Sequence, residues 1–322
     1  MTWRLFADCG YSTIICAFGV CEIVRVRWKA VMRAYVILAH KNLDQLPRLI
    51  RRLDTEESSF FLHIDKKTDT TAYEQELSEV SQMPNVVFVK RYHCPWATFG
   101  IIRAQRAAME AALRVSPRFT HLTLLTGQDY PIRPADEINL FFDTHRGASF
   151  IGYLPGNTKR QRKKQQRARY KNWYLYLAGR HWRVPSKLLS KVGVERRIPA
   201  GFRTIKGRAC FTLSRECTEY ALRFLEENPR YIKFFRHTKH PDEYFWPTVL
   251  LNSPLRETVV NIHLRYEPFE EGSGHGRVLR KDDLGELKRA SSEHFFAKKF
   301  DRTVDSDILD LIDEQILAIT NR

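Results

Sequence analysis

The chain has 322 residues, 43% of them apolar and 12% aromatic, which is enough to bury the core of one large globular domain or two small ones. Lys and Arg outnumber Asp and Glu by 53 to 37, which favours an anionic partner: a nucleic acid, a membrane surface or a phosphorylated substrate. The six cysteines show neither C-x-x-C spacing nor interleaved histidines, which argues against a zinc site or a disulfide framework and favours free thiols in a reducing cytoplasm.

Residues 1–32 precede the first well-patterned strand, and we treat them as an N-terminal extension of doubtful structure. Their apolar run, Tyr11 to Cys21, has about ten residues before Glu22, fewer than the roughly 20 that span a bilayer. Asp8 precedes this run and no clear cleavage site follows it, so a signal peptide is poorly formed. Met32 is a second possible translation start. Residues 33–322 are predicted to form a single domain.

Buried strands and amphipathic helices alternate from residue 34 onward. Strands are predicted over 34–39, 60–64, 86–89 and 121–125, with helices over 43–53 and 101–113. Later in the chain the pattern predicts a strand over 210–213 and helices over 215–227 and 241–251. Strands that alternate with helices predict an α/β fold with a mostly parallel central sheet and helices on both faces.

Polar residues follow three of the predicted strands. His40 follows the first, Asp65 the second and Gln128-Asp129 the strand over 121–125. Because ligands bind at the carboxyl ends of the strands in open parallel sheets, we expect these residues on one rim that holds a nucleotide.

A strongly basic segment lies between the two halves of this pattern. Residues 156–208 hold seventeen Lys or Arg residues and the single acid Glu195, so the rest of the chain is close to neutral. The segment is either a solvated loop and helix surface or a binding element. As a nucleic-acid-binding element it would use Lys159 to Arg169 for phosphate contacts, with Tyr170, Trp173 and Tyr174 as stacking groups.

Seven short motifs occur in a fixed order along the chain. They are Ala34-Tyr35 through His40-Lys41; His63-Ile64-Asp65-Lys66-Lys67; Trp96-Ala97-Thr98-Phe99-Gly100; Gly127-Gln128-Asp129-Tyr130-Pro131-Ile132; Lys206-Gly207 with Phe211-Thr212-Leu213-Ser214-Arg215-Glu216; Pro241-Asp242-Glu243; and Phe296-Ala297-Lys298-Lys299-Phe300-Asp301. Over residues 33–302 the chain thus resembles the core-2/I-branching β-1,6-N-acetylglucosaminyltransferases and the related peptide O-xylosyltransferases, and looks like a bacterial-type member. The resemblance implies a GT-A type fold, a UDP-sugar donor and transfer with inversion.

Two departures from the family concern the acceptor. Arg265-Tyr266-Glu267-Pro268-Phe269 stands where animal members carry paired aromatics, and Cys210 stands where bacterial relatives often show Trp. The acceptor is therefore not carried over from the resemblance.

The sequence predicts a site without a metal ion. Many GT-A enzymes bind a metal through Asp-x-Asp at a strand end, but the matching position here reads Gly127-Gln128-Asp129, with Asp129 as its one carboxylate and a supporting residue. A literal Asp-x-Asp at Asp305-Ser306-Asp307 precedes a helical pattern, so helix capping explains it better.

Without a metal, fixed cations must stabilise the departing diphosphate. The resemblance assigns this to Arg277 and Lys299, since Arg grips phosphate oxygens with two parallel hydrogen bonds and Lys acts as a point charge. The alternative is two ordinary surface cations, and Arg280 lies three residues from Arg277.

The resemblance also implies donor contacts. Asp65 is expected near the uridine, with a turn cap as the alternative. Trp96 offers a stacking face for the base but is also a typical core residue, and His40 either contacts the donor or caps a helix.

Glu243 is the predicted catalytic base, with Asp242 as a supporting hydrogen-bond partner. Both assignments come from the Pro-Asp-Glu motif. Taken alone, the two acids would be surface residues that complement the dipole at a helix start.

We therefore predict an inverting, metal-independent glycosyltransferase without a cofactor, which moves N-acetylglucosamine from a UDP donor to a glycan hydroxyl. The alternatives are a UDP-xylose-dependent xylosyltransferase, a nucleic-acid-binding protein and a relative that binds a nucleotide without transfer. We expect a cytoplasmic protein or one held on the cytoplasmic face of the membrane, where the basic segment would contact anionic lipid.

Overall fold

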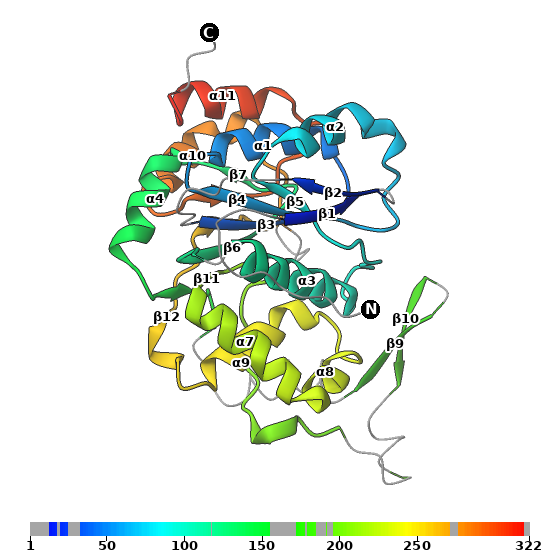
Figure 1. The fold of residues 1–322 in the computed structure, drawn as a ribbon. Coiled ribbons are helices and arrows are strands. Elements are labelled where there is room, and N and C mark those ends of the chain that lie inside the picture. The colour runs from blue at the N-terminus through cyan, green and yellow to red at the C-terminus, as the bar shows by residue number, and fades with distance from the viewer. Residues whose placement is uncertain are drawn as a thin grey trace.

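The computed structural model describes residues 13–17, 20–24, 33–116, 118–154, 172–177, 179–184, 191, 196–270 and 276–318. A central sheet lies between two layers of helices, with α1, α2 and α11 on one side and α3, α7 and α9 on the other (Figure 1). This three-layer arrangement confirms the predicted α/β class and agrees with a GT-A type fold.

The central sheet has the strand order β12-β8-β11-β6-β3-β4-β5. Its strands are Val259–Val260 (β12), Ser149–Phe150 (β8), Thr212–Ser214 (β11), His121–Thr126 (β6), Arg33–Ala39 (β3), Ser58–Ile64 (β4) and Val86–Phe88 (β5). Only β11 runs antiparallel to its neighbours, β6 and β8. The sheet is therefore mostly parallel, as the alternation of strands and helices predicts.

The inner strand β3 shows why both faces of the sheet need covering. Ala34, Val36 and Leu38 belong to one core cluster, while Tyr35, Ile37 and Ala39 belong to the cluster on the other face. Successive side chains of a strand point to opposite faces, so an unbroken apolar run must bury both.

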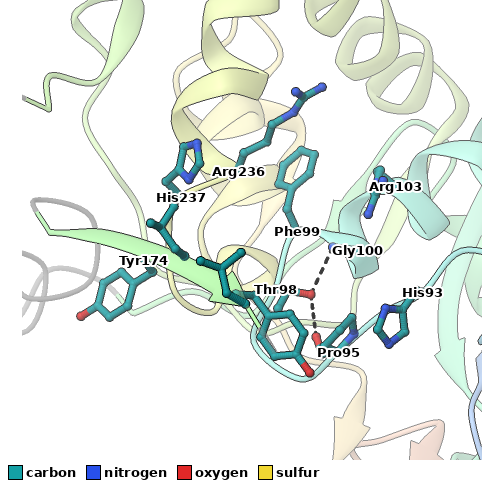
Figure 2. A pocket seen from close by; sticks show the side chains of 12 residues that line it. His93, Pro95, Thr98, Phe99, Gly100, Arg103, Tyr174, Arg236 and His237 are labelled. Carbon is teal, nitrogen blue, oxygen red and sulfur yellow. Dashed lines mark hydrogen bonds between the residues drawn. The ribbon is translucent and has the colours of Figure 1, made fainter. Parts of the chain in front are cut away.

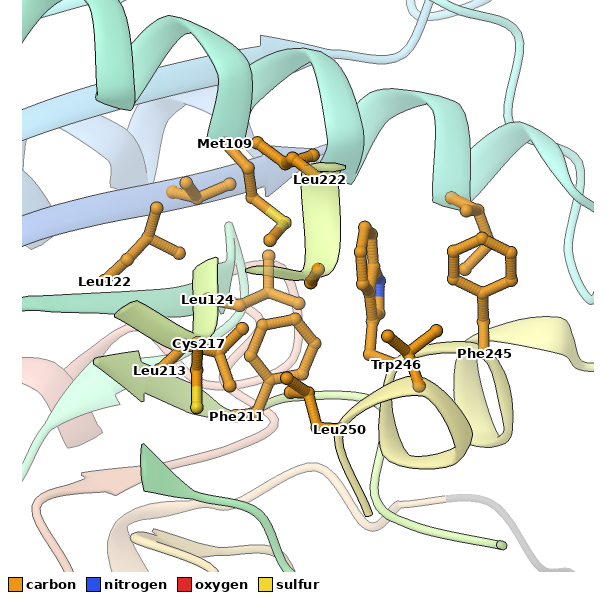
Figure 3. Close-up of a cluster of buried hydrophobic side chains, with 14 of the residues drawn as sticks. Met109, Leu122, Leu124, Phe211, Leu213, Cys217, Leu222, Phe245, Trp246 and Leu250 are labelled. Carbon is orange, nitrogen blue, oxygen red and sulfur yellow. The ribbon is translucent and has the colours of Figure 1, made fainter. Parts of the chain in front are cut away.

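One helical layer packs against the first of these clusters. It contains α3 (Gly100–Val115), α7 (Arg215–Glu227), α8 (Pro229–Phe235) and α9 (Phe245–Leu251). Figure 3 shows this cluster, in which Trp246 of α9 lies among side chains of the sheet and of α3 and α7. The indole Nε1 of Trp246 donates to Oε1 of Gln105 at 2.7 Å, so the buried ring keeps a hydrogen-bond partner.

The other layer covers the opposite face. It contains α1 (Leu46–Leu53), α2 (Glu74–Gln82), α4 (Ala135–Thr144), α10 (Leu284–Ala290) and α11 (Asp307–Gln315). Short 3-10 turns are Leu43–Gln45 (η1), Thr71–Tyr73 (η2), Pro199–Gly201 (η4), Pro241–Glu243 (η5), Arg256–Thr258 (η6) and Lys281–Asp283 (η7). None of the described helices is long and apolar enough to cross a membrane.

Three smaller sheets complete the described structure. Tyr130–Pro131 (β7), Arg265–Tyr266 (β13) and Phe296–Ala297 (β14) form a three-stranded sheet. Thr13–Ala17 (β1) pairs with Val20–Val24 (β2) inside the N-terminal extension. Trp173–Leu177 (β9) and Arg180–Val184 (β10) form a hairpin inside the basic segment, and it projects beside α8 (Figure 1).

One predicted helix differs from the structure. The pattern over 241–251 is a 3-10 turn, η5, followed by α9, because His240 adopts a left-handed conformation and Tyr244 (φ −123°) departs from helical geometry. The two acids of this motif therefore lie ahead of α9 and not in its first turn.

Candidate active site

The carboxyl ends of three parallel strands form one edge of the central sheet. Asp65 N donates to Ala39 O at 2.8 Å, and Gly127 N donates to Leu38 O at 2.9 Å, so the turns after β4 and β6 are both bonded to the end of β3. The prediction that His40, Asp65 and Gln128-Asp129 share one rim is confirmed.

Asp65 is buried, with 2% of its surface exposed, and both carboxylate oxygens accept backbone hydrogen bonds. Lys67 N donates to Oδ1 at 3.0 Å and Cys94 N donates to Oδ2 at 3.2 Å. The first bond is the turn cap considered above, and the second fastens the loop that carries Trp96 to the end of β4. A carboxylate has about four acceptor positions, so a contact to the donor stays compatible with both bonds.

Trp96 is not a core residue, because 62% of its surface is exposed. Its ring meets that of His240 edge-on, with centroids 4.5 Å apart, and His240 N donates to Ala97 O at 3.2 Å. Ala97 (φ 60°) and His240 (φ 52°) are both left-handed, a conformation that costs a residue with a side chain about 1–3 kcal/mol. Two strained residues therefore join the Trp96 loop to the Pro241–Glu243 turn.

Glu243 lies in η5, half-buried, with its Oε2 3.2 Å from Nζ of Lys206. Gly207 N donates to Glu243 O at 2.7 Å. Lys206 therefore contacts the side chain of Glu243, and Gly207 contacts its backbone. A Cβ on Gly207 would lie 2.6 Å from Cγ of Pro247, which explains why glycine follows Lys206. Lys206 has no predicted role of its own, although the Lys-Gly motif is the signal that marks it.

Asp242 occupies the same turn as Glu243 and is half-buried. The aromatic residues that follow, Tyr244, Phe245 and Trp246, are fully buried in the core. Their packing fixes the position of the turn, while the Glu243 carboxylate contacts the polar side chain of Lys206.

Lys299 is half-buried next to other charged groups. Desolvation lowers the pKa of its ammonium, and Lys298 lowers it further, against an opposing contribution from Glu267. The pKa of His40 is lowered by desolvation and by Lys41, and Lys299 acts in the same direction, so the His40 ring and the Lys299 ammonium are electrostatic neighbours. His40 is exposed and caps no helix, because Asn42 holds the N-cap of η1.

Arg277 has a different environment from the one expected of a phosphate-binding cation. Its Nη1 lies 2.5 Å from Asp283 and its Nη2 lies 2.9 Å from Glu286, and the Asp283 hydrogen bond is the largest cause of its raised pKa. Both ends of the guanidinium fork are thus occupied. Arg280, three residues on, is exposed.

Asp129 is buried and fully engaged with protein groups. Arg265 Nε donates to its Oδ1, while N and Oγ1 of Thr126 both donate to its Oδ2 at 2.7 Å. The side chains of Asp129 and Arg265 are 0% and 3% exposed. Asp129 thus supports the turn after β6.

The literal Asp-x-Asp is a helix cap, as expected. Oδ1 of Asp305 accepts from the N–H groups of Asp307 and Ile308 at 3.0 Å, at the start of α11. Its Oδ2 accepts from Lys281 N at 3.0 Å, which ties α11 to η7.

Contacts of the seven motifs, or of residues beside them such as Cys94 and His240, thus connect all seven segments. Besides the bonds above, Lys41 Nζ lies 2.6 Å from Asp301, and Phe300 N donates to Gln128 O at 2.9 Å. The arrangement offers a carboxylate able to take a proton, Glu243, which is held by Lys206, and an ammonium, Lys299, which acts on His40 at the end of β3. The Lys159 to Arg169 run of the basic segment lies outside the described residues.

A cavity of about 450 Å³ adjoins this site between the start of α3, strand β9 and the end of α8 (Figure 2). Thr98 and His237 line it, close in sequence to the bonded pair Ala97 and His240. None of the residues predicted to bind the donor or to take the proton lines this cavity.

A family model described as Core-2/I-Branching enzyme matches residues 33–288. The chain is 27% identical over 302 residues to xylosyltransferase 2 of Rattus norvegicus, a match that covers 87% of this chain and 33% of that protein. It is 24% identical over 298 residues to xylosyltransferase 1 of Canis lupus familiaris, covering 87% and 30%. The chain thus spans about a third of the length of these relatives.

A solved structure titled as mouse xyloside xylosyltransferase 1, apo form, has 11% sequence identity. The match covers 83% of this chain and 97% of that chain, with a TM-score of 0.39. At this score the resemblance is weak.

Proposed function

This chain belongs to the Core-2/I-Branching enzyme family, and from that membership we propose that it transfers a sugar from a UDP donor to an acceptor hydroxyl. The observation that carries the proposal is the contact between Glu243 of the Pro-Asp-Glu motif and Lys206 of the Lys-Gly motif at 3.2 Å.

The proposed donor sugar is xylose. The relatives reported above are xylosyltransferases, which supports the xylose alternative better than the N-acetylglucosamine that the sequence motifs alone favoured. The acceptor in this proposal is a glycan.

In the proposed reaction, Glu243 accepts the proton of the acceptor hydroxyl as its oxygen attacks the anomeric carbon of the sugar. A bond forms between that oxygen and the anomeric carbon, and the bond from the anomeric carbon to the diphosphate breaks on the opposite face. UDP leaves with the bonding electrons, and its negative charge is stabilised by the Lys299 ammonium. Lys206 would hold the Glu243 carboxylate in place.

Metal independence is part of the proposal. Its support is that both oxygens of Asp129, the carboxylate at the position of the usual metal ligand, are occupied by Arg265 and Thr126. We predict that activity survives an excess of EDTA, measured as UDP release before and after chelation. A strict requirement for manganese or magnesium, restored when the ion is added back, would contradict this.

A screen of UDP-sugars tests the proposed function. UDP-xylose, UDP-N-acetylglucosamine and UDP-glucose are compared for UDP release, and UDP for protection against thermal unfolding. We expect UDP to raise the melting temperature and UDP-xylose to be turned over at least tenfold faster than the others. If UDP binds but no UDP-sugar is turned over, the chain is a relative that binds a nucleotide without transfer. If UDP does not bind and no UDP-sugar is turned over, the proposal is overturned.

A further inference from the structure

The cavity beside the site is lined by none of the residues predicted to bind the donor or to take the proton. Its volume of about 450 Å³ suits one or two sugar rings and lies in the usual range for ligand pockets. A neighbouring cavity of about 290 Å³ is also lined by Phe99, Arg103 and Arg236. The two cavities therefore border the same three side chains.

The lining of the larger cavity is cationic. Two arginines, Arg103 and Arg236, line it together with His93 and His237, and among the described residues no Asp or Glu lines it (Figure 2). Desolvation and Arg196 lower the pKa of His237, so its imidazole adds no positive charge at neutral pH. Arg103 and Arg236 are exposed and have no ion-pair partner within the described part of the chain. The smaller cavity includes Glu110, but that carboxylate is paired with Arg106 at 2.6 Å.

The wall formed by the β9–β10 hairpin is held in place by a half-buried arginine. Nη1 of Arg196 donates to His237 O at 2.8 Å and to Asn172 O, and its Nη2 donates to Thr238 Oγ1 at 2.9 Å. Tyr174 N donates to His237 O at 3.0 Å. Burial lowers the pKa of Arg196 to about 10, which leaves it charged at neutral pH. The basic hairpin is therefore attached to the end of α8.

Aromatic side chains supply the rest of the lining. Phe99, Tyr174 and Tyr176 offer flat apolar surfaces. Cations beside aromatic rings suit a sugar ring that carries a negative charge, because the ring packs against the aromatics while the charge meets the guanidinium groups.

Backbone hydrogen bonds connect the wall of the cavity to the turn that carries the proposed base. Thr98 lies one residue from Ala97 and His237 three residues from His240, and Ala97 and His240 are hydrogen-bonded at 3.2 Å. Glu243 N in turn donates to His240 O at 3.3 Å.

We propose that this cavity binds an anionic sugar residue of the acceptor glycan, with Arg103 and Arg236 pairing with its charge. Because the ligand is the acceptor of the transfer described above, the inference rests on the proposed function. Binding of the saccharide can be measured without any transfer, so the experiment can reject this inference and the proposed function independently of each other.

Isothermal titration calorimetry at low salt, with and without UDP, tests the inference. The probes are a tetrasaccharide that contains glucuronic acid, its carboxyl-reduced counterpart and a glutamate-rich peptide of the same charge. The test variant is Arg103→Gln/Arg236→Gln. The matched control is Arg114→Gln/Lys233→Gln, which removes two positive charges from exposed positions on α3 and α8 that line neither cavity.

We expect the parent and the control to bind the acidic tetrasaccharide at least tenfold more tightly than the reduced one, and added salt to weaken the preference. The test variant should lose the preference while its melting temperature stays near that of the parent; if it does not fold, Arg103→Gln alone should reduce the preference severalfold. Equal affinity of the two saccharides, an unchanged test variant, or tight binding of the peptide alone would overturn the inference.

Discussion

Two buried carboxylates at the ends of strands hold the backbone of the candidate site in place. Asp65 accepts hydrogen bonds from two backbone N–H groups, and Asp129 accepts them from the Arg265 guanidinium and from N and Oγ1 of Thr126. An ionised carboxylate is stable in such a place only where several donors replace its water. These two residues therefore define the shape of the rim.

Asp301 plays a comparable role between two distant motifs. Its carboxylate pairs with Lys41 at 2.6 Å and accepts from Thr303, and these contacts outweigh desolvation and lower its pKa to about 2. A carboxyl whose folded pKa lies below its unfolded value stabilises the fold above the unfolded pKa, near 3.9, and loses that contribution as the pH falls towards 2.

We predict that Asp301→Asn lowers the free energy of unfolding by about 1–2 kcal/mol at pH 6. The difference between variant and parent should shrink between about pH 4 and pH 2. Urea denaturation at several pH values measures it. A difference that stays constant over this range would show that the charge of Asp301 contributes nothing.

At the residue scale, the sequence motifs indicate which side chains belong to the candidate site, but they do not indicate which hydrogen bonds and ion pairs those side chains form. Asp65 lies at the predicted edge, Lys299 acts on His40 there, and Glu243 pairs with Lys206. These partners depend on contacts between distant segments of the chain. Arg277 illustrates the limit, because Asp283 and Glu286 occupy its guanidinium and nothing local in the sequence separates it from the exposed Arg280.

Helix α11 begins with a cap that resembles a metal motif. Asp305 accepts two N–H groups of the first turn and one from Lys281, which satisfies donors that a helix start otherwise leaves without partners.

Asp305 directly precedes Ser306, the N-cap residue of α11, and its side chain does the capping. We predict that Asp305→Ala costs about 0.5–2 kcal/mol of stability, the range for a lost helix cap, and leaves turnover and its insensitivity to EDTA unchanged. Thermal unfolding and UDP release measure the two effects. Loss of turnover that an added divalent ion restores would instead assign a metal to this motif.

At the element scale, long and strongly patterned segments were predictable from sequence. The helix over 215–227 matches α7, and the strand over 34–39 differs from β3 by one residue. The two-residue strands β7, β13 and β14 could not be predicted, because their conformation depends on pairing with distant partners. The sequence pattern does not reveal the turn at Pro241–Glu243, because the left-handed conformation of His240 depends on its hydrogen bond to the Trp96 loop, a tertiary contact.

At the scale of the whole molecule, the positive charge is concentrated in residues 156–208, of which 172–177, 179–184, 191 and 196–208 are described. The described part of this segment reaches the chemistry, because Lys206 pairs with Glu243 and strand β9 lines the cavity. We propose that the run from Lys159 to Arg169 holds the protein to anionic lipid.

Replacing the Lys and Arg residues of 159–169 with Gln should therefore weaken binding to vesicles that contain anionic lipid, with UDP-sugar hydrolysis largely intact. Sedimentation with vesicles at low salt measures the binding, and neutral vesicles serve as the control. Equal binding by variant and parent would refute a membrane role for this run.

The central claim is that Glu243 is the base of a sugar transfer, and the turnover of Glu243→Gln tests it most directly. The amide keeps the shape of the side chain but cannot accept the proton, so turnover should fall by about 10² to 10⁴, or roughly 3 to 5 kcal/mol, while the affinity for UDP barely changes. Asp242→Asn, in the same turn, should cost less. A Glu243→Gln protein that retains more than about a tenth of parental turnover, a loss under about 1.4 kcal/mol, would contradict the claim.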